Sequence, residues 1–302
     1  MTRSRRDVAG DFWQLTKPRI VMMILVTTAA TAVIGAGGGV PVSAMLWLLV
    51  GTGLVAAAAG SANQVWESRI DAAMTRTASR PLPAGRLNRA VAGVYSLALL
   101  IAGTMILWGA FSVVPAAFGW ATWATYVFVY TPMKVRTTLN TTVGAIAGAL
   151  PVMIGYTATG GEVFSVAGWL LFVVLAAWQY PHFMAIAWMY RRQYGEAGFK
   201  MTPSVKPDGW SAAVQAIVGS GVLIAAAVML VWSVVWPVGS SQWAIGYGVV
   251  ASGLAVAAGW PMLAASVRFY RQRNDAAARR LLRSSLLVLP AVLVIATAGV
   301  LF

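Results

Sequence analysis

The 302-residue sequence has no cysteine, one histidine and only eight acidic residues. Without cysteine the chain can form no disulfide, no thiolate metal site and no cysteine nucleophile. Charged residues make up only 10% of the chain, whereas a soluble domain needs roughly 25% to cover its surface. These shortages exclude an ordinary soluble domain and any chemistry that depends on thiols.

Apolar residues take the place of the missing charges. Hydrophobic residues make up 59% of the chain, and the mean hydropathy is +0.75. Several apolar runs reach the ~20 residues that a helix needs to cross a hydrocarbon core of ~30 Å. The sequence therefore predicts an all-α polytopic membrane protein with one domain over residues 1–302 and a cytoplasmic lead at residues 1–18. The nine predicted spans are residues 19–37, 44–63, 89–109, 113–131, 141–159, 164–189, 211–236, 241–264 and 284–302.

The positions of the Lys and Arg residues predict the orientation of these spans. All 22 lie in the amino-terminal lead or around the breaks after spans 2, 4, 6 and 8, and the other four breaks contain none. By the positive-inside rule, the amino terminus and the basic loops are cytoplasmic and the carboxyl terminus is outside. The formal net charge of +14 is then explained by topology and anionic lipid, with a fraction left for an anionic substrate, and nucleic acid is not an expected partner. The breaks without Lys or Arg are residues 35–43, 108–115, 159–165 and 236–242.

Polar residues interrupt the apolar pattern in the stretch "NQVWESRID" at the end of the second predicted span. Asn63, Glu67 and Asp71 recur every four positions, so on a helix they share one face. A helix end that surfaces in water is one interpretation, although acidic residues are disfavoured at the negative carboxyl end of a helix. A metal site is the other, because one carboxamide and two carboxylates suit a hard cation such as Mg²⁺, which often bridges to substrate phosphates. The residues alone leave both interpretations open.

Basic side chains on the same membrane side favour an anionic ligand. The loop after this stretch carries four arginines, including Arg76 and Arg80, and the loop after span 4 carries Lys134 and Arg136. Arginine can bind phosphate oxygens through two hydrogen bonds at once. Topology alone would explain basic residues here, but acidic and basic groups side by side favour a diphosphate. We therefore predict that a diphosphate is bound by Arg76, Arg80, Lys134 and Arg136.

His182 is the only histidine, and it lies in an apolar helix about three turns before Arg191. Three turns correspond to ~16 Å, which places the imidazole well inside the membrane. Polar side chains at such positions usually face the bundle interior and often mark function. His182 is therefore either a packing residue bonded to a backbone carbonyl or a functional group. A functional imidazole could ligate haem iron or transfer protons.

Taken together, the polar stretches resemble the UbiA-type intramembrane prenyltransferases, and within them the protoheme IX farnesyltransferase branch. The family has nine membrane helices in a bundle with a cytoplasmic-side active site, and the similarity runs almost end to end. The stretch "WQYPHF" and the pattern "YxxAG" point to the haem branch. The other matching stretches are "LTKPRIVMMILVTTAATAVIG", "N-x3-E-x3-D" followed by "RTASRPLPAGRL", and "YTPMKVRTTLNTTVGAIAGALP".

The resemblance implies that the chain transfers the farnesyl group of farnesyl diphosphate to a vinyl group of haem b, which gives haem O. It also implies that Asn63, Glu67 and Asp71 bind Mg²⁺, which carries the diphosphate and draws it away from the allylic cation. His182 and Tyr194 then belong to the haem side of the site. The expected partners are farnesyl diphosphate, haem b, the lipid of a bacterial inner membrane, and haem A synthase or oxidase assembly factors.

The chain departs from the family pattern at two places. The first motif usually contains "DRD", where this chain has "ESR" from Glu67 onward, and glutamate reaches one methylene further than aspartate. The second motif usually reads "DYxxAG", where this chain has Gln193 before Tyr194. Gln193 offers a carbonyl oxygen but no charge, so a metal bound there should be held more weakly. Glu196, three residues further, could compensate from the same helical face.

Two other functions remain open at this point. One is a related prenyltransferase for another acceptor, such as a quinone-precursor aromatic acid, although such enzymes usually carry a fuller second acidic motif. The other is a non-catalytic haem-handling or transport protein. A transporter would be expected to have charges at the membrane midplane or broken helices in matching halves, whereas the polar residues here gather at one membrane face.

Overall fold

The computed structural model describes residues 5–235 and 242–301. Three parts of the prediction therefore lie outside the described residues. They are the start of the amino-terminal lead, most of the break at residues 236–242, and the span ends predicted at 236, 241 and 302. The described residues form helices and no strand: α1 (Arg5–Leu15), α2 (Pro18–Gly35), α3 (Val42–Asp71), α4 (Arg89–Ala110), α5 (Val113–Ala124), η1 (Thr125–Tyr130), α6 (Thr131–Met133), α7 (Asn140–Ala158), α8 (Val166–Met189), α9 (Arg191–Glu196), α10 (Thr202–Val205), α11 (Trp210–Val235), α12 (Gln242–Gln272) and α13 (Asp275–Ala298).

Nine helical segments in the described part of the chain are long and apolar enough to span a membrane, which confirms the predicted number. The π-helix η1 joins α5 to α6, so these three elements make one span over Val113–Met133. The structure differs from the prediction where polar residues follow apolar ones. Helix α3 continues beyond residue 63 to Asp71, because the polar residues in this part pack against neighbouring segments and are buried.

The last basic stretch is also more helical than a loop. Helix α12 ends at Gln272 and α13 begins at Asp275, so only two residues separate the helices. Asn274 makes this abrupt start possible because its side chain accepts a hydrogen bond from the backbone N–H of Ala277 at 2.9 Å. The basic residues of this stretch therefore lie on two helix ends.

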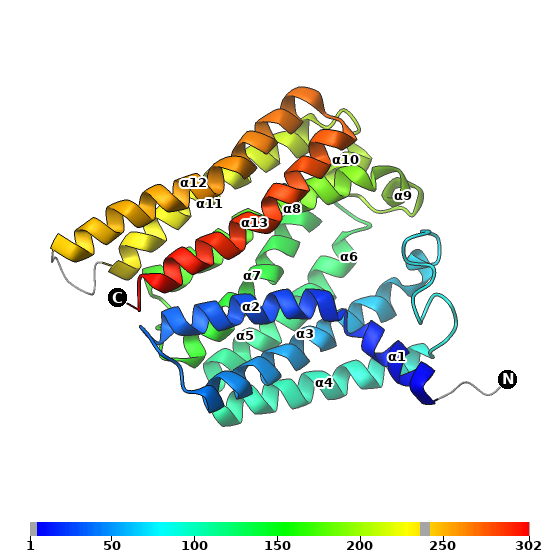
Figure 1. Cartoon of the computed structure of the whole chain (residues 1–302). Helices are drawn as coiled ribbons and strands as arrows, with labels where there is room; N and C mark the ends of the chain where they lie inside the picture. Colours follow the sequence, from blue (N-terminus) through cyan, green and yellow to red (C-terminus); the bar gives the residue numbers. More distant parts are fainter. Residues whose placement is uncertain (1–4, 236–241, 302) are drawn as a thin grey trace.

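The helices form two groups joined by α7 and α8 (Figure 1). Helices α2 to α5 pack together on one side, and α11, α12 and α13 pack together on the other. Helix α7 packs against α2, α5 and α8, while α8 packs against α11 and α13. Helix α13 also contacts α2, so the two groups of helices touch each other directly as well as through α7 and α8.

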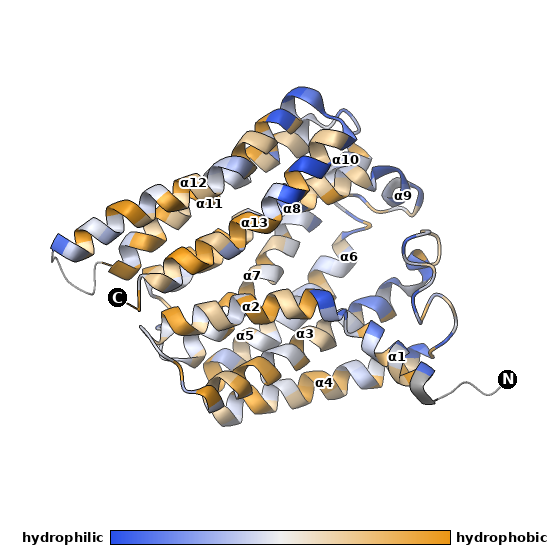
Figure 2. Cartoon of the chain, viewed as in Figure 1, coloured by the Kyte–Doolittle hydropathy of each residue, from blue (hydrophilic) through white to orange (hydrophobic). Residues whose placement is uncertain are grey.

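The polar and apolar residues of the bundle are segregated along its length. In Figure 2 the hydrophilic residues gather around α1, α9 and α10 and the segment that joins α3 to α4, while the middle of the long helices is mostly hydrophobic. Large apolar side chains are exposed on the outside of the bundle, among them Ile101, Leu254 and Leu287. Lipid is the solvent that such a surface requires. The polar residues therefore gather at one end of the bundle, where the basic loops lie.

Candidate active site

The structure places Asn63, Glu67 and Asp71 on the buried face of α3. Their exposed fractions are only 1%, 4% and 1%, so this helix end does not face water. The spacing of four residues brings the side chains into one row, as the sequence predicts. Buried carboxylates require partners that compensate for lost hydration.

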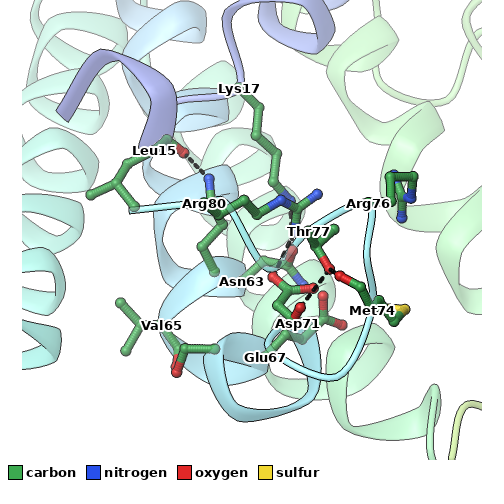
Figure 3. Close-up of polar contacts among 12 residues, drawn as sticks. Leu15, Lys17, Asn63, Val65, Glu67, Asp71, Met74, Arg76, Thr77 and Arg80 are labelled. Atoms are coloured by element: carbon green, nitrogen blue, oxygen red, sulfur yellow. Dashed lines mark hydrogen bonds and ion pairs between the residues drawn. The ribbon is translucent and has the colours of Figure 1, made fainter. Parts of the chain in front are cut away.

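Three cations from three different segments supply those partners, and Figure 3 labels two of them, Lys17 and Arg80, beside the row. Arg80 Nη1 lies 2.6 Å from Asp71 Oδ2, and Lys134 Nζ lies 2.8 Å from Glu67 Oε1. Lys17 Nζ donates a hydrogen bond to Asn63 Oδ1 at 2.6 Å. Three positive groups thus face two carboxylates and one amide oxygen, which leaves an excess of positive charge at a buried position.

Lys17 is a site residue that the sequence analysis did not identify. It lies between α1 and α2 in the left-handed region, with φ 54° and ψ 58°, a conformation that costs free energy for a residue with a side chain. Gln64 of α3 holds this link in place by donating to the carbonyl of Leu15 at 2.9 Å. Burial lowers the pKa of Lys17 below its ordinary value. The available signal was a lysine directly before Pro18, at the point where a span begins.

Lys134 is held by contacts on several sides. Its Nζ lies 4.6 Å from the centre of the Tyr130 ring, and its backbone carbonyl accepts a hydrogen bond from Lys200 N at 2.6 Å. Burial alone would lower the pKa of Lys134, but the negative charge of Glu67 and the nearby tyrosine hydroxyls raise it well above its ordinary value. The side chain is therefore a permanent cation at neutral pH.

Arg76 and Arg136 are placed differently from Arg80 and Lys134. Arg76 is exposed; its guanidinium lies 5.2 Å from the centre of the Tyr190 ring, and it donates to the Tyr194 hydroxyl at 3.5 Å. Figure 3 shows Arg76 apart from Arg80 and from the acidic row. Arg136 is exposed, and its guanidinium makes no hydrogen bond or ion pair with another described residue. Only two of the four basic residues predicted to bind diphosphate therefore touch the acidic row directly.

His182 lies on α8 against α13. Its Nδ1 is 3.0 Å from the Ser285 hydroxyl, and the Trp178 ring stacks on the imidazole with centres 4.7 Å apart. Ser285 donates its only hydroxyl proton to the carbonyl of Leu282 at 2.7 Å, so its oxygen must accept from His182. Nδ1 therefore carries the proton, and Nε2 keeps a free electron pair. The bond to a side chain, and not to a backbone carbonyl, differs from the packing interpretation of the sequence.

Comparison with known proteins identifies the family of the chain. The UbiA prenyltransferase family matches residues 24–289, which is most of the chain. The chain belongs to the UbiA prenyltransferase family. It is 56% identical over 284 residues to a protoheme IX farnesyltransferase of Rhodopirellula baltica, and the match covers 94% of this chain and 98% of that protein. This confirms the family and the branch that the sequence motifs indicated.

Solved structures show the same UbiA fold at low sequence identity. A structure described as digeranylgeranylglyceryl phosphate synthase in membranes matches with a TM-score of 0.73 and 14% identity, over 97% of this chain and 98% of that one. A UbiA homologue of Archaeoglobus fulgidus bound to DMAPP and Mg²⁺ matches with a TM-score of 0.67 and 14% identity, over 96% of this chain and 99% of that one. These similarities confirm the predicted all-α UbiA bundle.

The altered second motif of this UbiA member lies near the site but is not joined to the α3 row. Gln193 has a buried amide oxygen with no hydrogen-bond partner among the described residues, and Glu196 is exposed. Among the described residues, no hydrogen bond or ion pair joins either side chain to Asn63, Glu67 or Asp71. Tyr194 contacts Arg76 and the Phe199 ring, and not His182. The assignment of Gln193 and Glu196 to metal, and of Tyr194 to haem, stays a prediction.

The α3 row fits a magnesium ion by the chemistry of its donors. Mg²⁺ is usually held by one or two carboxylates, with water and substrate phosphates completing the coordination. Glu67 and Asp71 supply two carboxylates and Asn63 an amide oxygen, all on one helix face. No group of three or more His, Cys, Asp or Glu side chains gathers in the described part of the chain. Such a row therefore suits a cation that shares its coordination with a bound diphosphate.

Proposed function

We propose that this chain transfers the farnesyl group of farnesyl diphosphate to a vinyl group of haem b, which gives haem O. The observation that carries the proposal is the buried row of Asn63, Glu67 and Asp71, faced by three cations at one end of a membrane-spanning bundle. Its near full-length similarity to a protoheme IX farnesyltransferase supports the choice of haem b as the acceptor.

The acidic row and the three cations divide the work of binding a diphosphate. Asn63, Glu67 and Asp71 would hold Mg²⁺, which supplies positive charge to the oxygens of the leaving group. Lys17, Arg80 and Lys134 lie within 3 Å of the same row and can turn their donors toward phosphate oxygens. Arg76 and Arg136 then act from the exposed side, where they attract the diphosphate over a longer range.

The reaction breaks the bond between the farnesyl C1 and the diphosphate oxygen, and the electron pair leaves with the diphosphate. The vinyl π bond of haem b then attacks the allylic cation and forms the new carbon–carbon bond. Water adds to the resulting cation beside the ring, and a proton is lost. Because an early encounter with water would destroy the allylic cation, the reaction needs a dry chamber, which the apolar bundle beside the acidic row can provide.

His182 is the residue that we assign to haem. The neutral imidazole has its proton on Nδ1, held by Ser285, and a free electron pair on Nε2 that can ligate iron. The stacked Trp178 ring fixes the plane of the imidazole. His182 lies inside the α8 span, away from the diphosphate residues at the polar end, so it can orient the porphyrin while one vinyl group faces the allylic cation.

We place the chain in a bacterial inner membrane, and the distribution of basic residues supports an amino terminus and an acidic row on the cytoplasmic side. Water-soluble farnesyl diphosphate headgroups would then reach the site from the cytoplasm. Haem A synthase or oxidase assembly factors would receive the product within the same membrane.

The test is expression in cells that lack haem O synthase, followed by mass spectrometry of the extracted haems. A haem with a hydroxyethylfarnesyl group is the expected product of the wild-type chain and of Glu162→Ala, which removes an exposed acid between α7 and α8. Glu67→Ala and Asp71→Ala should give no product while their membrane folds remain intact. A farnesylated aromatic compound in place of haem O would instead identify another acceptor, and product from Asp71→Ala at wild-type levels would remove the metal role of the row.

A further inference from the structure

Asn63 has a feature that its place in the acidic row does not explain: the direction of its amide. An asparagine can help to bind a cation only through its oxygen, and the amide nitrogen would repel the cation. Because Asn63 is 1% exposed, water has little access to hold the group in either direction. The protein itself must decide which atom faces the site.

Thr131 of α6 decides it by hydrogen-bond chemistry. The Thr131 hydroxyl lies 2.8 Å from the carbonyl oxygen of Tyr126, and a carbonyl can only accept, so the single hydroxyl proton is used there. The Thr131 oxygen can then only accept, and the Asn63 atom 3.0 Å away must be the N–H donor Nδ2. The amide oxygen therefore points to the other side, toward Lys17.

Lys17 agrees with this direction but cannot maintain it alone. Its ammonium is a donor only, so the Asn63 atom at 2.6 Å must be the oxygen, as Thr131 requires independently. Lys17, however, occupies the position at the amide oxygen that a bound cation would take. When a cation replaces Lys17, Thr131 is the remaining described partner that holds the amide in place.

The π-helix η1 anchors Thr131 on the carbonyl of Tyr126. Tyr126 O accepts the backbone N–H of Thr131, five residues later, in addition to its hydroxyl. In an ordinary α-helix this carbonyl would pair with the N–H of Tyr130. The extra residue in the turn rotates the chain that follows by about 100° relative to an α-helix, since one residue of α-helix turns that much. The π-helix thus brings both the hydroxyl and the backbone N–H of Thr131 to one carbonyl.

We propose that Thr131 is a positioning residue: its hydroxyl, anchored on the π-helix carbonyl of Tyr126, directs the amide oxygen of Asn63 toward the bound cation. Thr131 itself is 2% exposed, and among the described residues its one hydrogen bond to the acidic row is with Asn63. This inference rests on the proposed function, because it requires that Asn63 binds a cation.

The test measures binding of Mn²⁺ to the purified full-length protein by electron paramagnetic resonance, with and without inorganic diphosphate. Thr131→Val keeps the shape and removes the hydroxyl, and Thr131→Ser keeps the hydroxyl. Partners of metal ligands are typically worth about 10-fold to 100-fold in affinity, so Thr131→Val should weaken Mn²⁺ binding by at least about 10-fold. Thr131→Ser should restore affinity to within about 3-fold of wild type. If Thr131→Val fails to fold, Thr131→Ala provides the same comparison.

The Asn63→Asp background separates orientation from packing. An aspartate presents an oxygen whichever way it turns, so Thr131→Val should change the Mn²⁺ affinity of Asn63→Asp by less than about 2-fold. An equal loss in both backgrounds would mean that Thr131 acts through packing, and would overturn the proposal. Wild-type affinity in Thr131→Val, together with weakened binding in Asn63→Ala, would also overturn it while leaving the metal site intact. Unchanged binding in Asn63→Ala would instead refute the proposed metal role of Asn63 itself.

Discussion

Replacing Lys134 by methionine should destabilise the protein by about 3 kcal/mol. The ion pair of Lys134 with Glu67 has a separation of 2.8 Å, and the two side chains are only 14% and 5% exposed. Removing one partner of a buried pair leaves an uncompensated charge and typically costs about 3–5 kcal/mol. We take the lower end because Lys17 also lies close enough to Glu67 to interact with its charge.

The double variant Lys134→Met/Glu67→Met provides the decisive comparison. Replacing both members of a buried ion pair by apolar side chains of similar volume is often neutral, so the double variant should lose less than about 1 kcal/mol. SDS titration of the purified protein, followed by circular dichroism, measures these free energies of unfolding. Lys134→Met within about 1 kcal/mol of wild type would refute the reasoning, and so would a double variant whose loss equals the sum of the losses in Lys134→Met and Glu67→Met.

Asp275→Asn is the matched control for burial. Asp275 also forms an ion pair at 2.8 Å, with Arg191, but its side chain is 48% exposed. The amide oxygen of the asparagine in the variant can still accept the hydrogen bond from Trp188 Nε1, so only the charge is lost. Exposed ion pairs contribute at most about 1 kcal/mol, and Asp275→Asn should therefore be much milder than Lys134→Met.

The ion pair of Lys134 with Glu67 also gives a pH dependence with a defined sign. The pKa of Lys134 is raised above its ordinary 10.5, so its contribution to stability is complete below that pH and is lost only as the pH rises through the raised value. The difference in unfolding free energy between wild type and Lys134→Met should therefore be constant between about pH 6 and about pH 9. A difference that shrinks within this range would show that Lys134 loses its proton more easily than the structure implies.

Three further predictions concern the substrates and the packing. Arg76→Gln and Arg80→Gln should mainly raise the KM for farnesyl diphosphate, and the effect of Arg76→Gln should be smaller at high salt because salt screens its exposed charge; an unchanged KM in both would return these residues to a role in topology. Titration of haem b into His182→Ala should show a shifted Soret band and weaker binding with unchanged affinity for farnesyl diphosphate, and spectra identical to wild type would make His182 a packing residue. Gly103→Ala should destabilise the protein by about 1–3 kcal/mol in the same SDS titration, because the added Cβ would lie 2.7 Å from the Gly51 carbonyl oxygen of α3. Gly93→Ala on the same helix has open space around it and should be neutral or stabilising.

Much of the fold could be predicted from the sequence because its signals are local. A run of ~20 apolar residues predicts a membrane-spanning helix wherever it occurs in the chain, and the number of predicted spans agrees with the nine long apolar helices of the described residues. The row of Asn63, Glu67 and Asp71 could be predicted for the same reason, since a spacing of four residues places side chains on one helix face. Helix ends were less predictable, because α3 continues through polar residues whose burial depends on distant segments.

The partners of the row were decided only by the tertiary structure. Lys17 and Asn63 are separated by 46 positions in the sequence, and Thr131 and Asn63 by 68. Helical periodicity relates residues within one element, whereas contacts between elements depend on how the helices pack. The π-turn before Thr131 adds a change of rotation that the 3.6-residue repeat does not anticipate. The sequence by itself therefore indicated the acidic row and four basic residues as candidates to bind a metal and a diphosphate, but it did not indicate Lys17. The packing of α2, α3 and α6 determined which cations neutralise the row and which way the amide of Asn63 points.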